Sequence, residues 1–442
     1  MSSTLKSAAA DEAARQGSLT EGLVSLIRSK PIEKRDLEAM ALFTLDGLAN
    51  MLAGRNTEPG RILLKWSSGR QGDAGRRALL RGGLMHILEV DDLHRNSVTH
   101  PGCVVIPAAL AIAEETGADG PALLRAILRG FEAVCRVGMA VGKEHYRIWH
   151  NTATCGPFGS AMASAELLGL DDAQAVHALG NAGTQSAGLW EFLETGAMSK
   201  HLHAGRAAEA GVVAGQLAAA GFTGPPAILE GERGLFAGAC PDPDPGAVLR
   251  DATAPWQIHS VSIKPWPSCR HTHPVIDAAL ELASKIDIAR IAKIDISTYQ
   301  AAVDVCDRPA PTTLYEAKFS LQHTVAAALS AGAVGFDSFE AEARDANAPL
   351  RAMTTIGAGE PYRGAYPDSW GGEVSVTLDD GSTVAASRTQ CKGDPEAALD
   401  RDDMIVKSRE LLSFGGVADV DGFIDSVLAM ADGGPVAQPP IG

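Results

Sequence analysis

The sequence predicts a mainly α-helical protein with an α+β second domain. From about Leu19 to Gly234, apolar residues recur at helical spacing in segments joined by short Gly/Pro loops. Only 5% of the residues are aromatic while 47 are Gly, a composition that favours closely packed helices over a β-sandwich. Beyond Pro255, runs of alternating apolar residues typical of strands appear for the first time.

The predicted elements follow one another in that order. In the first part, helices are expected at 35–52, 121–141, 159–168, 172–189 and 207–220. Strands are then expected at 257–264 and 292–299, helices at 272–285 and 316–331, and a hairpin at 373–378 and 383–387 around an Asp-Asp-Gly-Ser turn. The last forty residues return to helical spacing. The helical domain is therefore predicted to be discontinuous, 1–256 with 396–442, around an α+β domain at 257–395.

Charge and composition exclude several classes of partner. The 442 residues carry a formal net charge of −16, which argues against binding to nucleic acid or to an anionic membrane surface. No apolar run is long enough for a membrane span, and Ser2 to Gln16 lack the apolar core of a signal peptide. The seven cysteines form no CxxC pair, so no disulfide framework is expected. These features predict a cytoplasmic protein.

Basic residues gather just ahead of four expected helix starts, at 89–102, 150–157, 199–206 and 264–274. Helix N-termini offer unpaired N–H groups and a partial positive charge, so they bind carboxylates readily. Lys and Arg add full charges, and His transfers protons near neutral pH. If these segments converge, they form a pocket for a polyanion with titratable groups.

Each segment also has a plainer interpretation. A polar residue or a proline at a helix start is common for backbone reasons alone. Three groups have metal-like spacing, but no HExxH motif or Cys/His framework accompanies them; they are His201 with His203, His271 with His273, and Asp91 with Asp92 and His94. No GxGxxG, Walker or GxSxG motif is present. We therefore expect neither a metal nor an organic cofactor.

An ordered series of motifs resembles the MmgE/PrpD family over residues 20 to 430. The matching segments are 86–94 (HILEVDDLH) with 99–102 (THPG), Trp149-His150 with 156–161 (GPFGSA), 199–208 (SKHLHAGRAA), 221–225 (GFTGP) with 229–231 (LEG), 264–269 (KPWPSC) and 317–322 (AKFSLQ). The resemblance implies a large all-helical domain with a smaller α+β lid, a site between them, and a homodimer.

The resemblance also suggests site residues and a chemistry. Members of the family include 2-methylcitrate dehydratase, cis-aconitate decarboxylase and an iminodisuccinate epimerase, which all stabilise a carbanion-like centre beside a carboxylate. The positions that match polar active-site residues of the family are Asp91, His100, His150, Lys200 and Lys264, while 269–273 lies where the lid offers a further basic group.

In this interpretation, His100 and His150 supply the base and the acid, and Asp91 orients an imidazole. Lys200 completes the catalytic set. The residues expected to bind the substrate are His94, Arg206, Lys264, Arg270, His271 and His273. The substrate is expected to be a small di- or tricarboxylate.

Two positions depart from the family pattern. Glu89 stands where Asp is frequent, and Leu93 stands where the dehydratases and decarboxylases often have Thr. Loss of a hydroxyl removes a hydrogen-bond partner from the pocket. The sequence therefore favours an epimerase of the iminodisuccinate type, with a 2-methylcitrate-type dehydratase or a cis-aconitate-type decarboxylase as alternatives. A non-catalytic carboxylate-binding protein is the alternative from another class.

Overall fold

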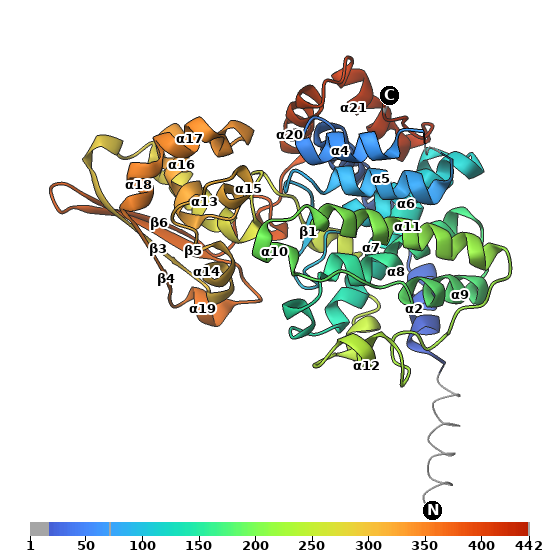
Figure 1. Cartoon of the computed structure of the whole chain (residues 1–442). Helices are drawn as coiled ribbons and strands as arrows, with labels where there is room; N and C mark the ends of the chain where they lie inside the picture. Colours follow the sequence, from blue (N-terminus) through green and yellow to red (C-terminus); the bar gives the residue numbers. More distant parts are fainter. Residues whose placement is uncertain (1–16, 70–71, 441–442) are drawn as a thin grey trace, which may run out of the picture. The chain divides into compact units, whose positions relative to one another are not determined.

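A computed structural model describes residues 17–69 and 72–440 (Figure 1). The N-terminal segment from Ser2 to Gln16, for which the sequence predicts no signal peptide, lies outside the described residues. The chain divides into two compact units. One takes the residues up to Ile87, Asp91–Val261 and the residues from Arg401 onward; the other takes Leu88–Val90 and Ser262–Asp400.

The first unit is helical. Its helices are α2 (Leu19–Ser29), α3 (Lys34–Gly54), α4 (Glu58–Ser67), α5 (Ala74–Met85), α6 (Pro101–Thr116), α7 (Gly120–Ala140), α8 (Asn151–Leu167), α9 (Asp172–Gly183), α10 (Phe192–Thr195), α11 (Ser199–Ala219), α12 (Leu235–Ala239), α20 (Arg401–Phe414) and α21 (Val420–Leu428). A two-residue strand, β1 (Leu93–His94), precedes α6.

Helix α11 lies at the centre of this unit and packs against α5, α6, α8 and α9. Two glycines allow the close approach. A Cβ on Gly205 would lie 2.4 Å from the carbonyl oxygen of Leu79 in α5, and a Cβ on Gly211 would lie 2.2 Å from the Cβ of Ser160 in α8. Neither neighbour is the end of a flexible side chain, so any larger residue would push the helices apart. The many small residues of the sequence thus serve helix packing.

A buried charge network ties distant parts of the helical unit together. The Glu132 carboxylate accepts hydrogen bonds from Lys30 Nζ at 2.9 Å, Arg136 Nε at 2.7 Å and the backbone N–H of Gln257 at 2.7 Å. Arg136, fully buried, donates in turn to the carbonyl oxygens of Val248 and Arg250. One carboxylate therefore neutralises two buried cations and fixes three segments of the chain.

The second unit is an α+β unit built on a mixed four-stranded sheet. The strand order is β4 (Thr354–Ala358), β3 (Ile291–Thr298), β5 (Gly372–Leu378) and β6 (Thr383–Arg388), with β3 and β4 parallel and the other pairs antiparallel. Its helices are α13 (His273–Ala283), α14 (Gln300–Cys306), α15 (Leu314–Lys318), α16 (Leu321–Ala331), α17 (Ala341–Ala346), α18 (Ala348–Ala352) and α19 (Tyr362–Ala365). Helix α13 packs on β5 and β6 and against α16. Alternate residues of β3 and β5 are buried and form the core beneath it.

The structure confirms the predicted fold class, the hairpin and the strand near 292–299. The strand expected at 257–264 is wrong for most of its length, because Gln257–Ser260 forms a 3₁₀ turn and only Val261–Ser262 is extended (β2). The helix expected at 316–331 is broken. Ser320 has an extended backbone and caps a new helix through its hydroxyl, which accepts from the N–H of His323.

The expected starts of two helices are too late, and one expected end is also wrong. Helices α8 and α11 begin at Asn151 and Ser199. Gly156, Pro157 and Gly205 lie inside these helices instead of ahead of them. Helix α9 ends at Gly183, six residues before the expected end. All seven cysteines lie in the described part of the chain, where they are buried and form no disulfide. None of the described helices is long and apolar enough to cross a membrane.

Candidate active site

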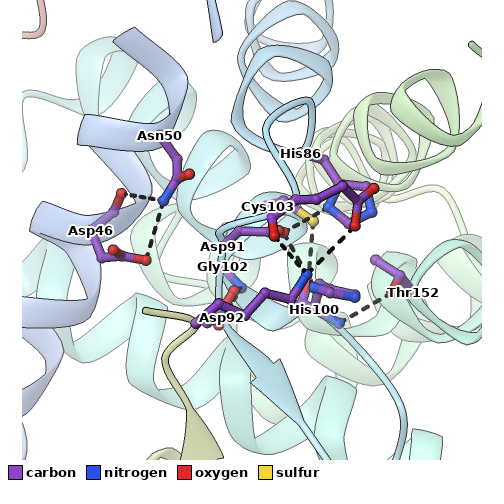
Figure 2. Close-up of polar contacts among 11 residues, drawn as sticks. Asp46, Asn50, His86, Asp91, Asp92, His100, Gly102, Cys103 and Thr152 are labelled. Carbon is purple, nitrogen blue, oxygen red and sulfur yellow. Dashed lines mark hydrogen bonds and ion pairs between the residues drawn. The ribbon is translucent and has the colours of Figure 1, made fainter. Parts of the chain in front are cut away.

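Two histidines share one buried carboxylate in the helical unit. The loop after α5 carries His86 and Asp91, and His100 is the N-cap residue of α6. Asp91 Oδ2 lies 2.6 Å from His86 Nδ1 and 3.3 Å from His100 Nδ1 (Figure 2). The two imidazole rings meet edge to face with centroids 4.7 Å apart. Asp91 can therefore orient both rings and stabilise positive charge that develops on them.

A second pair of histidines extends this group. His150, the N-cap residue of α8, stacks on His86 with ring centroids 5.8 Å apart, and its Nδ1 lies 3.3 Å from Nδ1 of His203 in α11. The indole of Trp190 packs against the His150 ring, with ring centroids 4.7 Å apart. Lys200, in the first turn of α11, is buried and lies near enough for its charge to act on both His150 and His203. We call His86, Asp91, His100, His150, Lys200 and His203 the histidine cluster.

The environment sets different charge states within the histidine cluster. Burial alone would raise the pKa of Asp91, but interactions with His86 and His100 outweigh it and hold that pKa well below its usual range. Burial, then the charges of His86 and Lys200, lower the pKa of His150 well below its usual range. The same causes lower the pKa of His203 to about 4. At neutral pH an ionised Asp91 thus lies in the same cluster as two neutral imidazoles, those of His150 and His203.

Asp92 anchors the start of α6 beside the histidine cluster. Its carboxylate oxygens lie 2.9 and 3.1 Å from the backbone nitrogen of Gly102, which donates to them (Figure 2). A Cβ at Gly102 would lie 2.7 Å from one of these oxygens, so a larger residue there would require the Asp92 carboxylate to move. Burial and the charge of Asp91 raise the pKa of Asp92 well above its usual range. The two adjacent aspartates therefore have different contacts. Asp91 interacts with imidazoles, and Asp92 accepts from a backbone N–H at the start of α6.

One group in the described part of the chain could hold a metal ion. Ligand atoms of His86, Asp91 and Cys103 lie within 4.8 Å of one another, and all three residues are buried. The short contact between His86 and Asp91 already occupies atoms that a metal would need. The Cys103 thiol lies 3.3 Å from the carbonyl oxygen of His100, to which it donates. This arrangement is that of a hydrogen-bonded network.

The substrate-binding residues expected in the α+β domain are buried in that unit. Lys264 Nζ donates to the carbonyl oxygen of Glu89 at 3.2 Å and lies 3.5 Å from its carboxylate. Glu89 has a backbone φ of 61°, a conformation that residues with a side chain seldom adopt. The Leu88 carbonyl next to it accepts from Lys318 Nζ at 3.0 Å. The backbone carbonyl oxygens of this segment therefore bind two lysines, Lys264 and Lys318.

The other three substrate-binding residues expected in the α+β domain contact residues of their own unit. Arg270 pairs with Asp394 and lies over Trp370. His271 Nδ1 lies 2.6 Å from the Tyr299 hydroxyl, and its ring stacks on Trp370 at 4.7 Å. His273 is the first residue of α13, and its Nε2 lies 3.3 Å from the Ser268 carbonyl oxygen. These contacts stabilise the segment from Ser268 to His273.

The two remaining expected binding residues lie in the helical unit. His94 is fully buried with Nδ1 2.8 Å from the Ser97 hydroxyl, and burial lowers its pKa to about 4. Arg206 is exposed on α11 and pairs with Glu209 one turn away. The structure therefore brings Asp91, His100, His150 and Lys200 together, whereas His94 and Arg206 make separate local contacts.

Sequence reasoning did not single out His86 and His203 as site residues. Both stand inside the motifs that were recognised, His86 five residues before Asp91 and His203 three residues after Lys200. A helical spacing would have placed His203 on the same face as Lys200. His86 follows the last turn of α5, and no spacing rule predicts its approach to Asp91.

Sequence comparison assigns the family. The MmgE/PrpD N-terminal domain matches residues 23–247, and the MmgE/PrpD C-terminal domain matches residues 266–428. The chain belongs to the MmgE/PrpD family. The histidine cluster lies within the part of the chain that matches the MmgE/PrpD N-terminal domain.

Similar MmgE/PrpD proteins are named as decarboxylases. The cis-aconitate decarboxylase-like protein oryM of Aspergillus oryzae (strain ATCC 42149 / RIB 40) is 27% identical over 365 residues, which cover 76% of this chain and 75% of that protein. Cis-aconitate decarboxylase of Homo sapiens is 27% identical over 353 residues, covering 75% and 71%. A cis-aconitate decarboxylase of Aspergillus terreus is 27% identical over 250 residues, about half of each chain, 52% and 51%.

Buried neutral histidines predict a loss of stability in mild acid. His94 has a folded-state pKa of about 4, whereas an unfolded histidine titrates near 6.5, so the unfolded state binds more protons between these values. Stability should therefore be constant above about pH 7 and fall as the pH drops from 6.5 toward 4, by about 2 kcal/mol at pH 5 for this residue. The shift of Asp91 acts only below about pH 4, because its pKa is lowered instead.

Urea unfolding at pH 7.5 and pH 5.0 measures this effect. In the His94→Asn variant, the difference in unfolding free energy between the two pH values should be smaller than in the wild type by about 2 kcal/mol. The amide can keep the contact with Ser97, so the comparison reports titration more than packing. An unchanged difference would show that His94 does not titrate on unfolding.

Proposed function

We propose that this chain is a cofactor-independent lyase that removes carbon dioxide from a small unsaturated tricarboxylate resembling cis-aconitate. The observation that carries the proposal is the buried carboxylate of Asp91 shared by two imidazoles, next to the neutral His150. Similarity to proteins named cis-aconitate decarboxylase supports the choice of reaction. The epimerase favoured by Leu93 is therefore replaced by one of its alternatives.

The proposed reaction needs charge at two places. When the bond to the departing carboxylate breaks, its electron pair stays on the substrate carbon and spreads onto the conjugated carboxylate that remains. Lys200 and the N–H groups at the starts of α6 and α8 can stabilise that developing charge. They are N–H donors and cations held by helices, so little rearrangement accompanies the reaction.

A proton must then reach the carbanion. We propose that His100 donates it, because the Asp91 carboxylate 3.3 Å away stabilises the ring while it carries the proton. His150, whose pKa is lowered by burial, remains neutral and can donate a hydrogen bond without a second full charge. His86 contacts the same carboxylate oxygen of Asp91 at 2.6 Å, so removal of His86 should affect the reaction through Asp91.

A product assay in deuterated water tests the proposal. The purified protein is incubated with cis-aconitate, 2-methylcitrate or iminodisuccinate, with EDTA present in every assay, and followed by proton NMR and a carbon dioxide assay. We expect cis-aconitate to release one equivalent of carbon dioxide and to give an unsaturated dicarboxylate with one deuterium at the protonated carbon.

Other outcomes identify the alternatives. Deuterium at the α-carbon of iminodisuccinate without carbon dioxide would show an epimerase, and formation of an unsaturated acid from 2-methylcitrate would show a dehydratase. Binding of all three acids without turnover would favour the carboxylate-binding protein. Each of these results would contradict the proposed decarboxylation.

A further inference from the structure

A cavity of about 650 Å³ opens in the helical unit beside the histidine cluster. The loop from Gln185 to Glu191, α10 and the first two turns of α11 surround it, together with the start of α8. Its wall is largely apolar and includes Trp149, Ala153, Leu189, Phe192, Leu202 and Ala207. Volumes of several hundred Å³ with such linings are typical of small-molecule sites.

The cavity adjoins the histidine cluster through two residues of its lining, His203 and Gly188. His203 lines it and lies 3.3 Å from His150, nitrogen to nitrogen. Gly188 also lines it, and its carbonyl oxygen accepts from the N–H of His150 at 3.0 Å. With φ at 124° and Ala153 2.5 Å from where a Cβ would stand, this position requires glycine. The loop is thus fixed at the junction between cavity and cluster.

The cavity and the histidine cluster offer different chemistry to one ligand. Asp91, His100, His150 and Lys200 do not line the cavity, whereas His203 and Arg206 do. Inside, Leu189 and Leu202 remain 51% and 48% exposed, which leaves apolar surface uncovered. An apolar group that covered this surface would gain affinity, by about fourfold for each buried methylene.

We propose that the substrate carries an apolar arm of about four or more carbons beside its carboxylates, and that this arm lies in the cavity. The inference rests on the proposed function for the carboxylate end. The substrate, and not a second copy of the chain, is then the occupant of the cavity. An unsubstituted acid such as cis-aconitate would then bind more weakly than the preferred substrate.

Calorimetric titration with unreactive dicarboxylates tests the inference. The probes are succinate and its 2-methyl, 2-butyl and 2-hexyl derivatives, which differ only in the length of the arm. We expect the dissociation constant to fall by at least tenfold from succinate to the 2-butyl derivative. The Leu202→Gln variant, similar in size but polar, should lose most of that gain and should bind succinate as the wild type does.

A matched control lies on the same helix. Val213 is 37% exposed on α11 and does not line the cavity, so Val213→Gln should keep the full gain from the arm. Equal affinity for all four probes would overturn the inference while leaving the proposed function standing, since succinate would still bind. Failure of every probe to bind would count against the proposed function as well.

Two further outcomes would also overturn the inference. A gain with chain length that survives Leu202→Gln would place the arm elsewhere. A change in molecular mass of Leu202→Gln by light scattering, with the gain intact, would show that copies of the chain cover the cavity wall.

Discussion

The His100→Asn variant should lose between a hundredfold and ten-thousandfold in kcat on the acid that the wild type decarboxylates, the range that a removed proton donor costs. His100 lies at the start of α6 with Nδ1 3.3 Å from Asp91. Asparagine can keep a polar contact with that carboxylate but cannot transfer a proton. Substrate binding should change much less than turnover, because Lys200 and the helix starts remain.

A control histidine separates chemistry from folding. His177 in α9 is partly buried and lies 3.0 Å, through Nδ1, from the carbonyl oxygen of Gly224, outside the histidine cluster. His177→Asn should retain nearly full turnover. Asp91→Asn should lose turnover as His100→Asn does, because an amide cannot stabilise an imidazolium. Normal turnover by His100→Asn, with the wild-type melting temperature, would assign the proton transfer to another residue.

The Glu132→Ala variant should lose about 3–5 kcal/mol of unfolding free energy, the usual cost of removing one partner from a buried charge network. Lys30 and the fully buried Arg136 would keep their charges without the carboxylate, and the N–H of Gln257 would lose its acceptor. Chemical denaturation of the protein, followed by the far-ultraviolet circular dichroism of its helices, measures the loss.

An exposed ion pair provides the comparison. Glu144 and Arg147 lie one turn apart with side chains 48% and 74% exposed, so Arg147→Ala should cost less than about 1 kcal/mol. If Glu132→Ala were equally mild, water or a rearranged side chain would have to satisfy Arg136. The buried network would then contribute specificity of folding instead of stability.

The fold class followed from the sequence because apolar spacing reflects burial directly. Helix α7 and the hairpin of β5 and β6 appear close to where periodicity and turn residues placed them. The errors have local causes. Gly156, Pro157 and Gly205 look like helix breakers, but they lie inside α8 and α11 where helices touch, so packing overrides their intrinsic preference. The apolar residues at 258 and 261 suit a 3₁₀ turn as well as a strand.

The histidine cluster could be predicted only in part. Asp91, His100, His150 and Lys200 were found because they stand in recognisable motifs ahead of, or at, helix starts. Their convergence depends on how α6, α8 and α11 pack, and no local pattern contains that information. The contact between His86 and Asp91 depends on a loop conformation. The apolar cavity depends on side chains of a loop and three helices, which a linear sequence does not distinguish from ordinary surface.

Because of the glycines of α11, the geometry of the histidine cluster depends on helix packing far from the cluster. Gly211 lies eleven residues from Lys200 along one helix, about 16 Å at 1.5 Å per residue. Because its backbone touches α8, a single added methyl group there would displace α11 against α8, which carries His150 at its start. Contacts two or three helical turns away therefore determine the spacing between Lys200, His203 and His150. Variation at such positions would adjust the geometry of proton transfer while leaving every reacting side chain unchanged.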